Sequence, residues 1–364
     1  MGRAEKEQLS KTLNSHLNTI HETLQVLDQR PASSLDKVSW EDVIKMGEQV
    51  SKQATMAGML WTGETPEVRA LEENMAAYFN TLQGFLLLSH GSTVGAGPTL
   101  YSCMHASVKQ IVDFSFKLFM ESVSSYGSRN KDQKLSIPQL VGSIWDACSA
   151  LKKTPSTNIT AIGRGMTQVA VSMKDVLREM KELKPGSSDP TDETSDEASN
   201  KAESEPLDDD DLCQDDLGND LSPEEMKVAQ SAIGVVSEML VVIKELIRTI
   251  TGLLKLENPN DCSNFVDGLE KLLKLCQGIG AQIDELGACL YPPQEVPAMK
   301  AASEKISNII DDMQIELENI KGTSEVFLQA CNGLRSSLRL FESELSCPTT
   351  SDLEDKMQNI ALSS

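Results

Sequence analysis

Aromatic residues, closely spaced metal ligands and long apolar runs are all scarce in this sequence. Phe, Trp and Tyr make up only 4% of the 364 residues, so a core would be built from aliphatic side chains, Met and Ala. No two of the eight cysteines are closer than thirteen positions, and the four histidines form no H-x-x-x-H pair. Because structural zinc sites use closely spaced ligands, we expect no metal and no cofactor. Free, mostly buried thiols in a reducing compartment explain the cysteines more simply.

Positive charge is also scarce. Lys and Arg number 33 against 55 Asp and Glu, which gives a formal net charge of −22 and argues against binding to nucleic acid or to anionic membranes. The acidity is concentrated in residues 185–221, where fourteen acids and one lysine give a net −13. The longest apolar stretch, GVVSEMLVVIKELIRTI, contains four charged residues. We therefore expect no membrane span.

Apolar residues spaced by three and four positions recur along most of the chain, which is the pattern of helices with one buried face. The longest such pattern covers residues 223–256, and no segment alternates convincingly like a strand. We predict about ten helices, six before residue 185 and four after residue 222. Ser222, Pro223 and Glu225 match a capping box with proline at the first helical position, so a helix should begin there.

Loops every 25–35 residues favour helical bundles over free coiled coils. We predict an all-α fold with two up-and-down antiparallel bundles. The expected parts are an N-terminal bundle (1–184), an acidic disordered linker (185–221), a C-terminal four-helix bundle (222–346) and a tail (347–364). The pattern leaves open whether the first helix, 5–28, packs in the N-terminal bundle or reaches both.

No motif predicts catalysis. In the acidic run EPLDDDDLCQDDLGNDLSPEE, an EF-hand register with Gly218 at position six places Cys213 and Leu217 where oxygen ligands are needed, which excludes that site. The glycines at 278 and 280 lie within a helical pattern, so close helix packing explains them better than a dinucleotide loop. The stretch GSTVGAGP reads as a loop without a phosphate-binding lysine. We therefore expect no enzyme activity.

Two residues are candidates for phosphorylation. Ser222 precedes proline at a predicted helix start, where a phosphate is electrostatically favoured. Thr194 is followed by Glu197 in acidic surroundings that suit an acid-directed kinase. Helix capping is the alternative interpretation of Ser222, and one residue can do both.

Three stretches together resemble the cyclin-D-interacting protein (GCIP) family: SIWDACSALKKTPSTNITAIGRGMTQVAVSMKDVLREMKEL, the acidic segment leading into LSPEEMKVAQSAIGVVS, and DELGACLYPPQEV. The most telling positions are Trp145, Cys148, Tyr291, Pro292 and Pro293. The resemblance spans about residues 35–345. It implies bundles similar to those of vinculin and α-catenin.

The resemblance also implies a non-enzymatic regulator that binds D-type cyclins and signalling adaptors in cytoplasm and nucleus and restrains cell-cycle progression. No basic region precedes a helix pair, so the sequence departs from any DNA-binding version of the family. We expect a monomer or weak oligomer that binds proteins, with no direct contact to nucleic acid or membrane. The alternative is a cytoskeletal or signalling adaptor of the vinculin kind, because the same architecture serves both.

Overall fold

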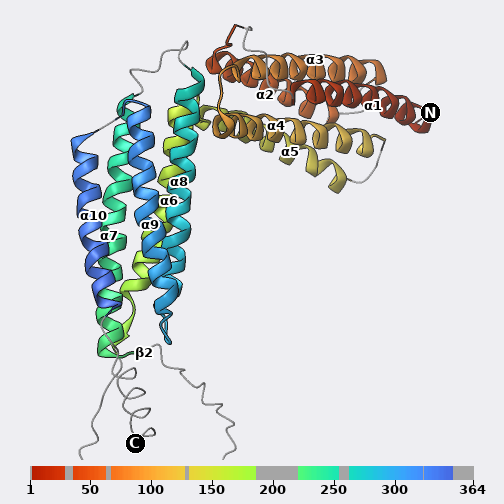
Figure 1. Cartoon of the computed structure of the whole chain (residues 1–364). Helices are drawn as coiled ribbons and strands as arrows, with labels where there is room; N and C mark the ends of the chain where they lie inside the picture. The colour runs from red at the N-terminus through yellow and green to blue at the C-terminus, as the bar shows by residue number, and fades with distance from the viewer. Residues whose placement is uncertain are drawn as a thin grey trace, which may run out of the picture. The chain divides into compact units, whose positions relative to one another are not determined.

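The computed structural model describes residues 2–28, 36–62, 67–127, 131–185, 220–253, 262–322 and 324–346, and within these ranges the fold is all-α, as predicted (Figure 1). The acidic segment that we expected to be disordered, Thr194 within it, and the tail 347–364 lie outside the described residues. The helices are α1 (Gly2–Leu27), α2 (Trp40–Thr62), α3 (Val68–Ser92), α4 (Pro98–Ser125), α5 (Lys131–Ala150), α6 (Asn158–Lys181), α7 (Pro223–Gly252), α8 (Cys262–Ala288), α9 (Val296–Asn319) and α10 (Glu325–Glu344), with a 3-10 turn η1 (Leu151–Lys153).

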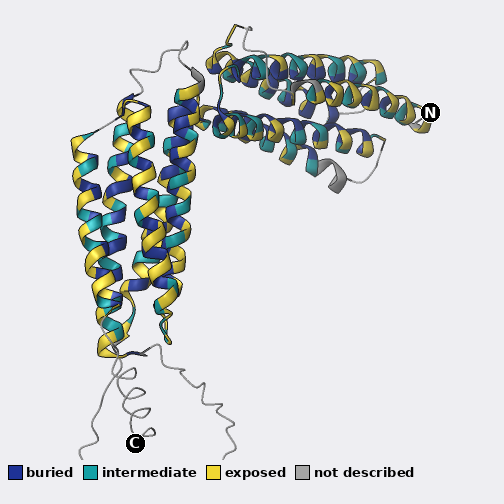
Figure 2. Ribbon diagram, viewed as in Figure 1, coloured by how far each residue is buried: buried dark blue, intermediate teal, exposed yellow. Residues whose placement is uncertain are grey.

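The first of two compact units contains Met1–Arg164 and Leu253–Lys271. Within it α1 packs against α3 and α4, which answers the question that the sequence left open about the first helix. The helix α2 packs against α3 and α5. The few aromatic residues are concentrated here: the Phe119 ring lies 4.7 Å from Tyr78 and 6.4 Å from Trp61, between ring centroids. Figure 2 shows the buried residues lining the facing sides of these helices.

The glycine-rich loop between α3 and α4 is held by the first turn of α6. The Asn158 side chain accepts a hydrogen bond from the backbone N–H of Gly97 (2.8 Å) and donates one to the carbonyl of Gly95 (3.0 Å). A Cβ added at Gly97 would lie 2.6 Å from Val266 Cγ1, so only glycine allows this close approach. The stretch GSTVGAGP therefore spans the end of α3, a loop and the start of α4. Gly91 and Gly97 allow close packing, whereas Gly95 adopts a left-handed backbone conformation with φ of 72°.

Glu270 of α8 caps the N-terminus of α4. Its Oε1 accepts a hydrogen bond from the backbone N–H of Thr99 (2.8 Å), and its Oε2 accepts one from the Thr99 hydroxyl (2.6 Å). The residue at the N-cap position, Gly97, has no side chain to do this. A carboxylate here satisfies an otherwise unpaired amide and interacts favourably with the helix dipole.

The second unit contains Gly165–Gly252 and Leu272–Ser364. Here α10 packs against α7 and α9. The helix α8 lies between α6 and α9, and glycines allow it to approach both. Added Cβ atoms at Gly280 and Gly287 would lie 3.0 Å and 2.8 Å from Val169 and Val176 of α6, respectively. A Cβ at Gly278 would lie 3.5 Å from Ile309 of α9, so the packing role predicted for the glycines at 278 and 280 agrees with the structure.

These contacts place most of α6 in the second unit. The boundary falls between Arg164 and Gly165, inside α6, whereas the sequence led us to expect it at residue 184. The second unit consequently contains part of α6 in addition to α7, part of α8, α9 and α10. Most of α6 belongs to the second unit because its valines pack against the glycines of α8. Periodicity in the sequence shows that one face of α6 is buried, but it does not show which helix covers that face.

A short parallel pairing joins the end of α6 to the start of α7. The strands β1 (Lys184–Pro185) and β2 (Asp220–Leu221) pair Lys184 with Asp220 and Pro185 with Leu221. Both strands belong to the second unit. The acidic segment between them therefore connects two helices of one unit, rather than one unit with the other.

Among the described residues, α7 is long and apolar enough to cross a membrane by length and composition alone. Its buried residues, however, recur on one face and pack within the second unit, and it carries Glu238, Lys244, Glu245 and Arg248. This is the pattern of a core helix in a bundle.

Candidate protein-interaction surface

Three large apolar side chains are exposed on the outer side of α2 and α5, in the first unit. Met56 and Met59 of α2 are 48% and 71% exposed, and Trp145 of α5 is 46% exposed. The indole N–H of Trp145 donates a hydrogen bond to the Thr55 hydroxyl (3.0 Å), which fixes the ring against α2. We call Met56, Met59 and Trp145 the α2–α5 patch.

The patch rests on a close helix pair. A Cβ added at Gly58 would lie 2.8 Å from Val141 Cγ2, so glycine lets α2 approach α5 tightly beneath the exposed side chains. At Gly142, one turn before Trp145, an added Cβ would meet no heavy atom within 4 Å, which leaves open space beside the indole. The surface next to the indole is therefore not filled by other side chains of the chain.

An ion pair joins α2 to η1, the 3-10 turn that follows α5. Lys152 Nζ lies 3.0 Å from Glu48 Oε1, and this ammonium group holds the pKa of Glu48 below its usual value. Both side chains are at least half exposed, so the pair adds little stability. A polar border around exposed Trp and Met side chains is characteristic of protein-binding sites, where Trp often dominates affinity and Met adapts to different partners.

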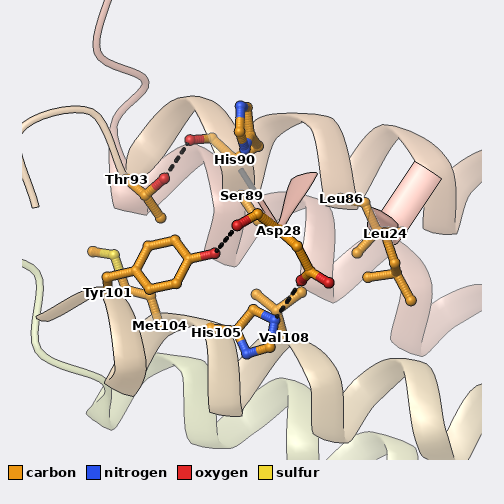
Figure 3. Close-up of a pocket in the computed structure, with 10 residues that line it drawn as sticks. All are labelled: Leu24, Asp28, Leu86, Ser89, His90, Thr93, Tyr101, Met104, His105 and Val108. Carbon is orange, nitrogen blue, oxygen red and sulfur yellow. Dashed lines mark hydrogen bonds and ion pairs between the residues drawn. The ribbon is translucent and has the colours of Figure 1, made fainter. Parts of the chain in front are cut away.

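A separate hollow lies in the first unit between the ends of α1 and α3 and the start of α4 (Figure 3). It encloses about 390 Å³, open solvent included, and its apolar lining includes Leu86 and Met104. His105 Nε2 lies 3.3 Å from Asp28 Oδ1, and the His105 and Tyr101 rings stack. The Tyr101 hydroxyl donates to the Asp28 carbonyl (3.5 Å). These polar groups join the end of α1 to α4.

Within the residues that the structure describes, no group of three or more His, Cys, Asp or Glu side chains is arranged to hold a metal ion. Four of the described thiols are buried: Cys148, Cys276, Cys289 and Cys331. Burial raises the pKa of both Cys148 and Cys276 to about 12, so these groups remain protonated at neutral pH. A protonated thiol is a poor nucleophile.

The structure separates the residues that carry the family resemblance. Trp145 belongs to the α2–α5 patch, whereas Cys148, three residues further along α5, is only 5% exposed and packs in the core. In the turn between α8 and α9, Tyr291 is 41% exposed, and the bond between Pro292 and Pro293 is cis.

Two predicted motifs of the second unit lie together. The Ser222 hydroxyl accepts a hydrogen bond from the Glu225 amide (3.2 Å), and the Glu225 carboxylate accepts one from the Ser222 amide (2.9 Å), as expected for the capping box. The Gln294 side chain, which follows the proline pair, donates to the Glu225 carbonyl (3.0 Å). The turn between α8 and α9 is thereby tied to the start of α7.

Sequence reasoning did not identify Met56, Met59, Asn158 or Glu270. The two methionines gave a usable signal, since they are apolar residues that lie off the buried face of α2. Glu270 and Asn158 gave none, because a carboxylate or amide in a helix is common and its distant partner is not visible in the sequence.

Comparisons with known proteins identify the family. A model for the N-terminal domain of Grap2 and cyclin-D-interacting proteins matches residues 42–186, and a model for the C-terminal domain matches residues 207–315. The cyclin-D1-binding protein 1 homolog of Xenopus laevis is 22% identical over 279 residues, which cover 74% of this chain and 77% of the relative. The two domain matches together cover more than half of the chain, in the expected order. The chain therefore belongs to the Grap2 and cyclin-D-interacting family.

Proposed function

We propose that this chain is a non-enzymatic protein-interaction regulator that binds D-type cyclins. The support is its membership of the Grap2 and cyclin-D-interacting family and the printed name of its frog relative. By binding a cyclin, the protein would restrain cyclin-dependent phosphorylation and so cell-cycle progression, in cytoplasm and nucleus. Signalling adaptors are the second proposed class of partner.

The α2–α5 patch is the proposed binding surface, and its exposed tryptophan is the observation that carries this choice. Trp145 is held in place by Thr55, so little conformational freedom is lost when a partner covers it. The exposed methionines Met56 and Met59 add to the apolar area of the patch. An amphipathic helix of the partner fits such a surface through apolar side chains at three- and four-residue spacing.

Binding of purified D-type cyclin to variants tests this proposal. We expect Trp145→Ala to weaken binding by roughly 30-fold, as for a central hot-spot residue, and Met59→Lys to weaken it further. Met120→Lys is the matched control, because Met120 is an exposed methionine of α4 in the same unit. Equal affinity for all three variants and the unmodified chain would remove the α2–α5 patch as the binding site.

Cyclin binding and actin co-sedimentation, measured side by side, separate a cyclin-binding regulator from a cytoskeletal adaptor. Cyclin binding together with a flat actin co-sedimentation curve supports the first. Retention of actin and adhesion proteins without cyclin binding contradicts the proposed function.

Phosphorylation of Ser222 is a proposed means of regulation. The residue is exposed, precedes Pro223 and lies at the N-cap of α7, where added negative charge interacts favourably with the helix dipole. Thr194 is the second proposed acceptor. Phosphopeptide mapping of the protein from cells tests both, and unmodified peptides from cycling and arrested cells would count against them.

A further inference from the structure

The hollow between the end of α1, the end of α3 and the start of α4 in the first unit combines apolar walls with one exposed acid (Figure 3). Leu86 and Met104, which line it, are each 1% exposed, and Val108 is 7% exposed. The Asp28 side chain, which also lines it, is 65% exposed. Apolar walls with a few polar groups that fix orientation are typical of small-ligand sites. We call this site the α1–α4 hollow.

The Asp28 carboxylate offers an unpaired oxygen at the mouth of the hollow. Its Oδ1 lies 3.3 Å from His105 Nε2, whereas among the described residues its Oδ2 accepts no hydrogen bond. A neutral imidazole at His105 donates to Oδ1 without cancelling the charge of the carboxylate. The Tyr101 hydroxyl donates to the Asp28 carbonyl (3.5 Å), which ties the backbone of this residue to α4. The mouth therefore carries a negative charge in a defined position.

Two hydroxyl groups that line the hollow are already satisfied within α3 and its C-cap. The Ser89 hydroxyl donates to the Phe85 carbonyl (2.7 Å), and the Thr93 hydroxyl donates to the His90 carbonyl (2.8 Å). Neither hydroxyl proton is left to bind an anion, and the Asp28 carboxylate repels one. The hollow therefore favours a cationic ligand over a carboxylate or a phosphate.

The size of the hollow limits the ligand to a small molecule. It encloses about 390 Å³, open solvent included. At ~30 Å³ for each water-sized group, this is room for about a dozen non-hydrogen atoms. A ligand of this size places one short aliphatic or aromatic group against Leu86 and Met104, and its charged end then lies at the mouth beside Asp28.

We propose that the α1–α4 hollow binds a small organic amine, with its apolar group against Leu86, Met104 and Val108 and its ammonium group on Asp28. An ammonium group has three N–H donors, of which Asp28 Oδ2 accepts one and water at the open mouth accepts the others. A hydrogen bond between two charged groups is stronger than one between neutral groups, so the charge on both partners contributes to affinity.

This site is separate from the proposed cyclin-binding surface. Its lining comes from α1, α3 and α4, whereas the α2–α5 patch is formed by Met56, Met59 and Trp145. Binding of an amine to the hollow therefore does not depend on whether the chain binds a cyclin.

Titration of the full chain with 4-methylpentylamine, followed by NMR of methionine labelled with ¹³C at the methyl group, tests the proposal. Met104 lines the hollow, whereas Met59 and Met120 are 71% and 53% exposed elsewhere in the same unit. We expect a saturable shift of the Met104 signal with a millimolar dissociation constant, because the ligand has few atoms. The signals of Met59 and Met120 should not move. Loss of one signal in Met104→Leu assigns the Met104 methyl group.

Two analogues and two variants isolate the contribution of the ion pair. The uncharged 4-methylpentan-1-ol should bind roughly tenfold more weakly than the amine, and 4-methylpentanoate should produce no saturable shift. Asp28→Asn should weaken binding of the amine by roughly tenfold and leave the affinity for the alcohol unchanged. Glu22→Gln, which removes an exposed acid from α1, is the matched control and should leave the affinity for the amine unchanged.

Three outcomes would overturn the proposal. One is equal affinity of the unmodified chain for the amine and the alcohol. Another is equal affinity of Asp28→Asn and Glu22→Gln for the amine, in variants whose circular dichroism matches that of the unmodified chain. The third is a shift of the Met104 signal that does not saturate and that Met59 and Met120 share, which indicates non-specific association.

Discussion

Replacing Glu270 by alanine removes the cap of α4 without disturbing the core, because the side chain is only partly buried. The carboxylate accepts one hydrogen bond from the Thr99 amide and one from its hydroxyl, at 2.8 Å and 2.6 Å. In Glu270→Ala both donors lose their partner, and the first turn of α4 should open more often.

The expected magnitude follows from the charge on the acceptor. A hydrogen bond to a charged group contributes about 1.5–3 kcal/mol, and the interaction of a carboxylate with a helix N-terminus contributes about 0.3–1 kcal/mol. Solvent at this partly buried site reduces the total, so we expect a loss of about 1.5–3 kcal/mol. This corresponds to roughly 10- to 150-fold faster hydrogen exchange at the Thr99 amide, if exchange follows opening of the first turn.

Residue-resolved hydrogen exchange of the full chain measures this change. The matched control is Asp267→Ala, which removes an exposed acid one turn earlier on α8 and should leave Thr99 unaffected. Thr99→Val removes only the hydroxyl donor, and its effect should largely disappear in the Glu270→Ala background. Full additivity of the two substitutions, or equal exchange in Glu270→Ala and Asp267→Ala, would refute the capping role.

Three other predictions concern the second unit, α6 and a core thiol. Ser222→Ala should lower the free energy of unfolding by about 1 kcal/mol through loss of the α7 cap, whereas Ser222→Asp should retain it; equal urea midpoints for both would contradict this. Gly165→Ala places a Cβ 2.9 Å from Leu273 and should lower the free energy of unfolding by about 1–3 kcal/mol. In Gly163→Ala the added Cβ meets no heavy atom within 4 Å, so the free energy of unfolding should rise by up to about 1 kcal/mol. Urea midpoints in the reverse order would be inconsistent with this packing. Burial raises the pKa of Cys148 from 9.0 to about 12, so above pH 9 the unfolded chain releases this proton first; stability should therefore decline from pH 9 towards 12, and Cys148→Ala should show a shallower decline in the pH profile of its urea midpoints.

The secondary structure could be predicted because each helix carries its own pattern. Spacing of three and four residues marked the helices, and the Ser222 capping box marked the start of α7 within one residue. The family followed from the order of three stretches, although none was specific alone.

The division into units could not be predicted, because it depends on which helix covers which face. The spacing of Val169 and Val176 predicts a buried stripe in either arrangement, and the glycines at 280 and 287 select α8 as the helix that covers it. Of the proposed binding surface, the sequence identified Trp145 but not the two methionines. Trp145 was noted as a family-like position, but its hydrogen bond to Thr55, ninety residues away, is not visible in the sequence.

The cap of α4 by Glu270 has a consequence for synthesis on the ribosome. Thr99 precedes its capping carboxylate by 171 residues, so α1 to α5 leave the ribosome long before Glu270 exists. During that interval Gly97 supplies no side chain, and the amide of Thr99 is bonded to water. The first unit thus reaches its final form only after all of α7 and the start of α8 have been translated, and a nascent chain that stops earlier carries an uncapped α4.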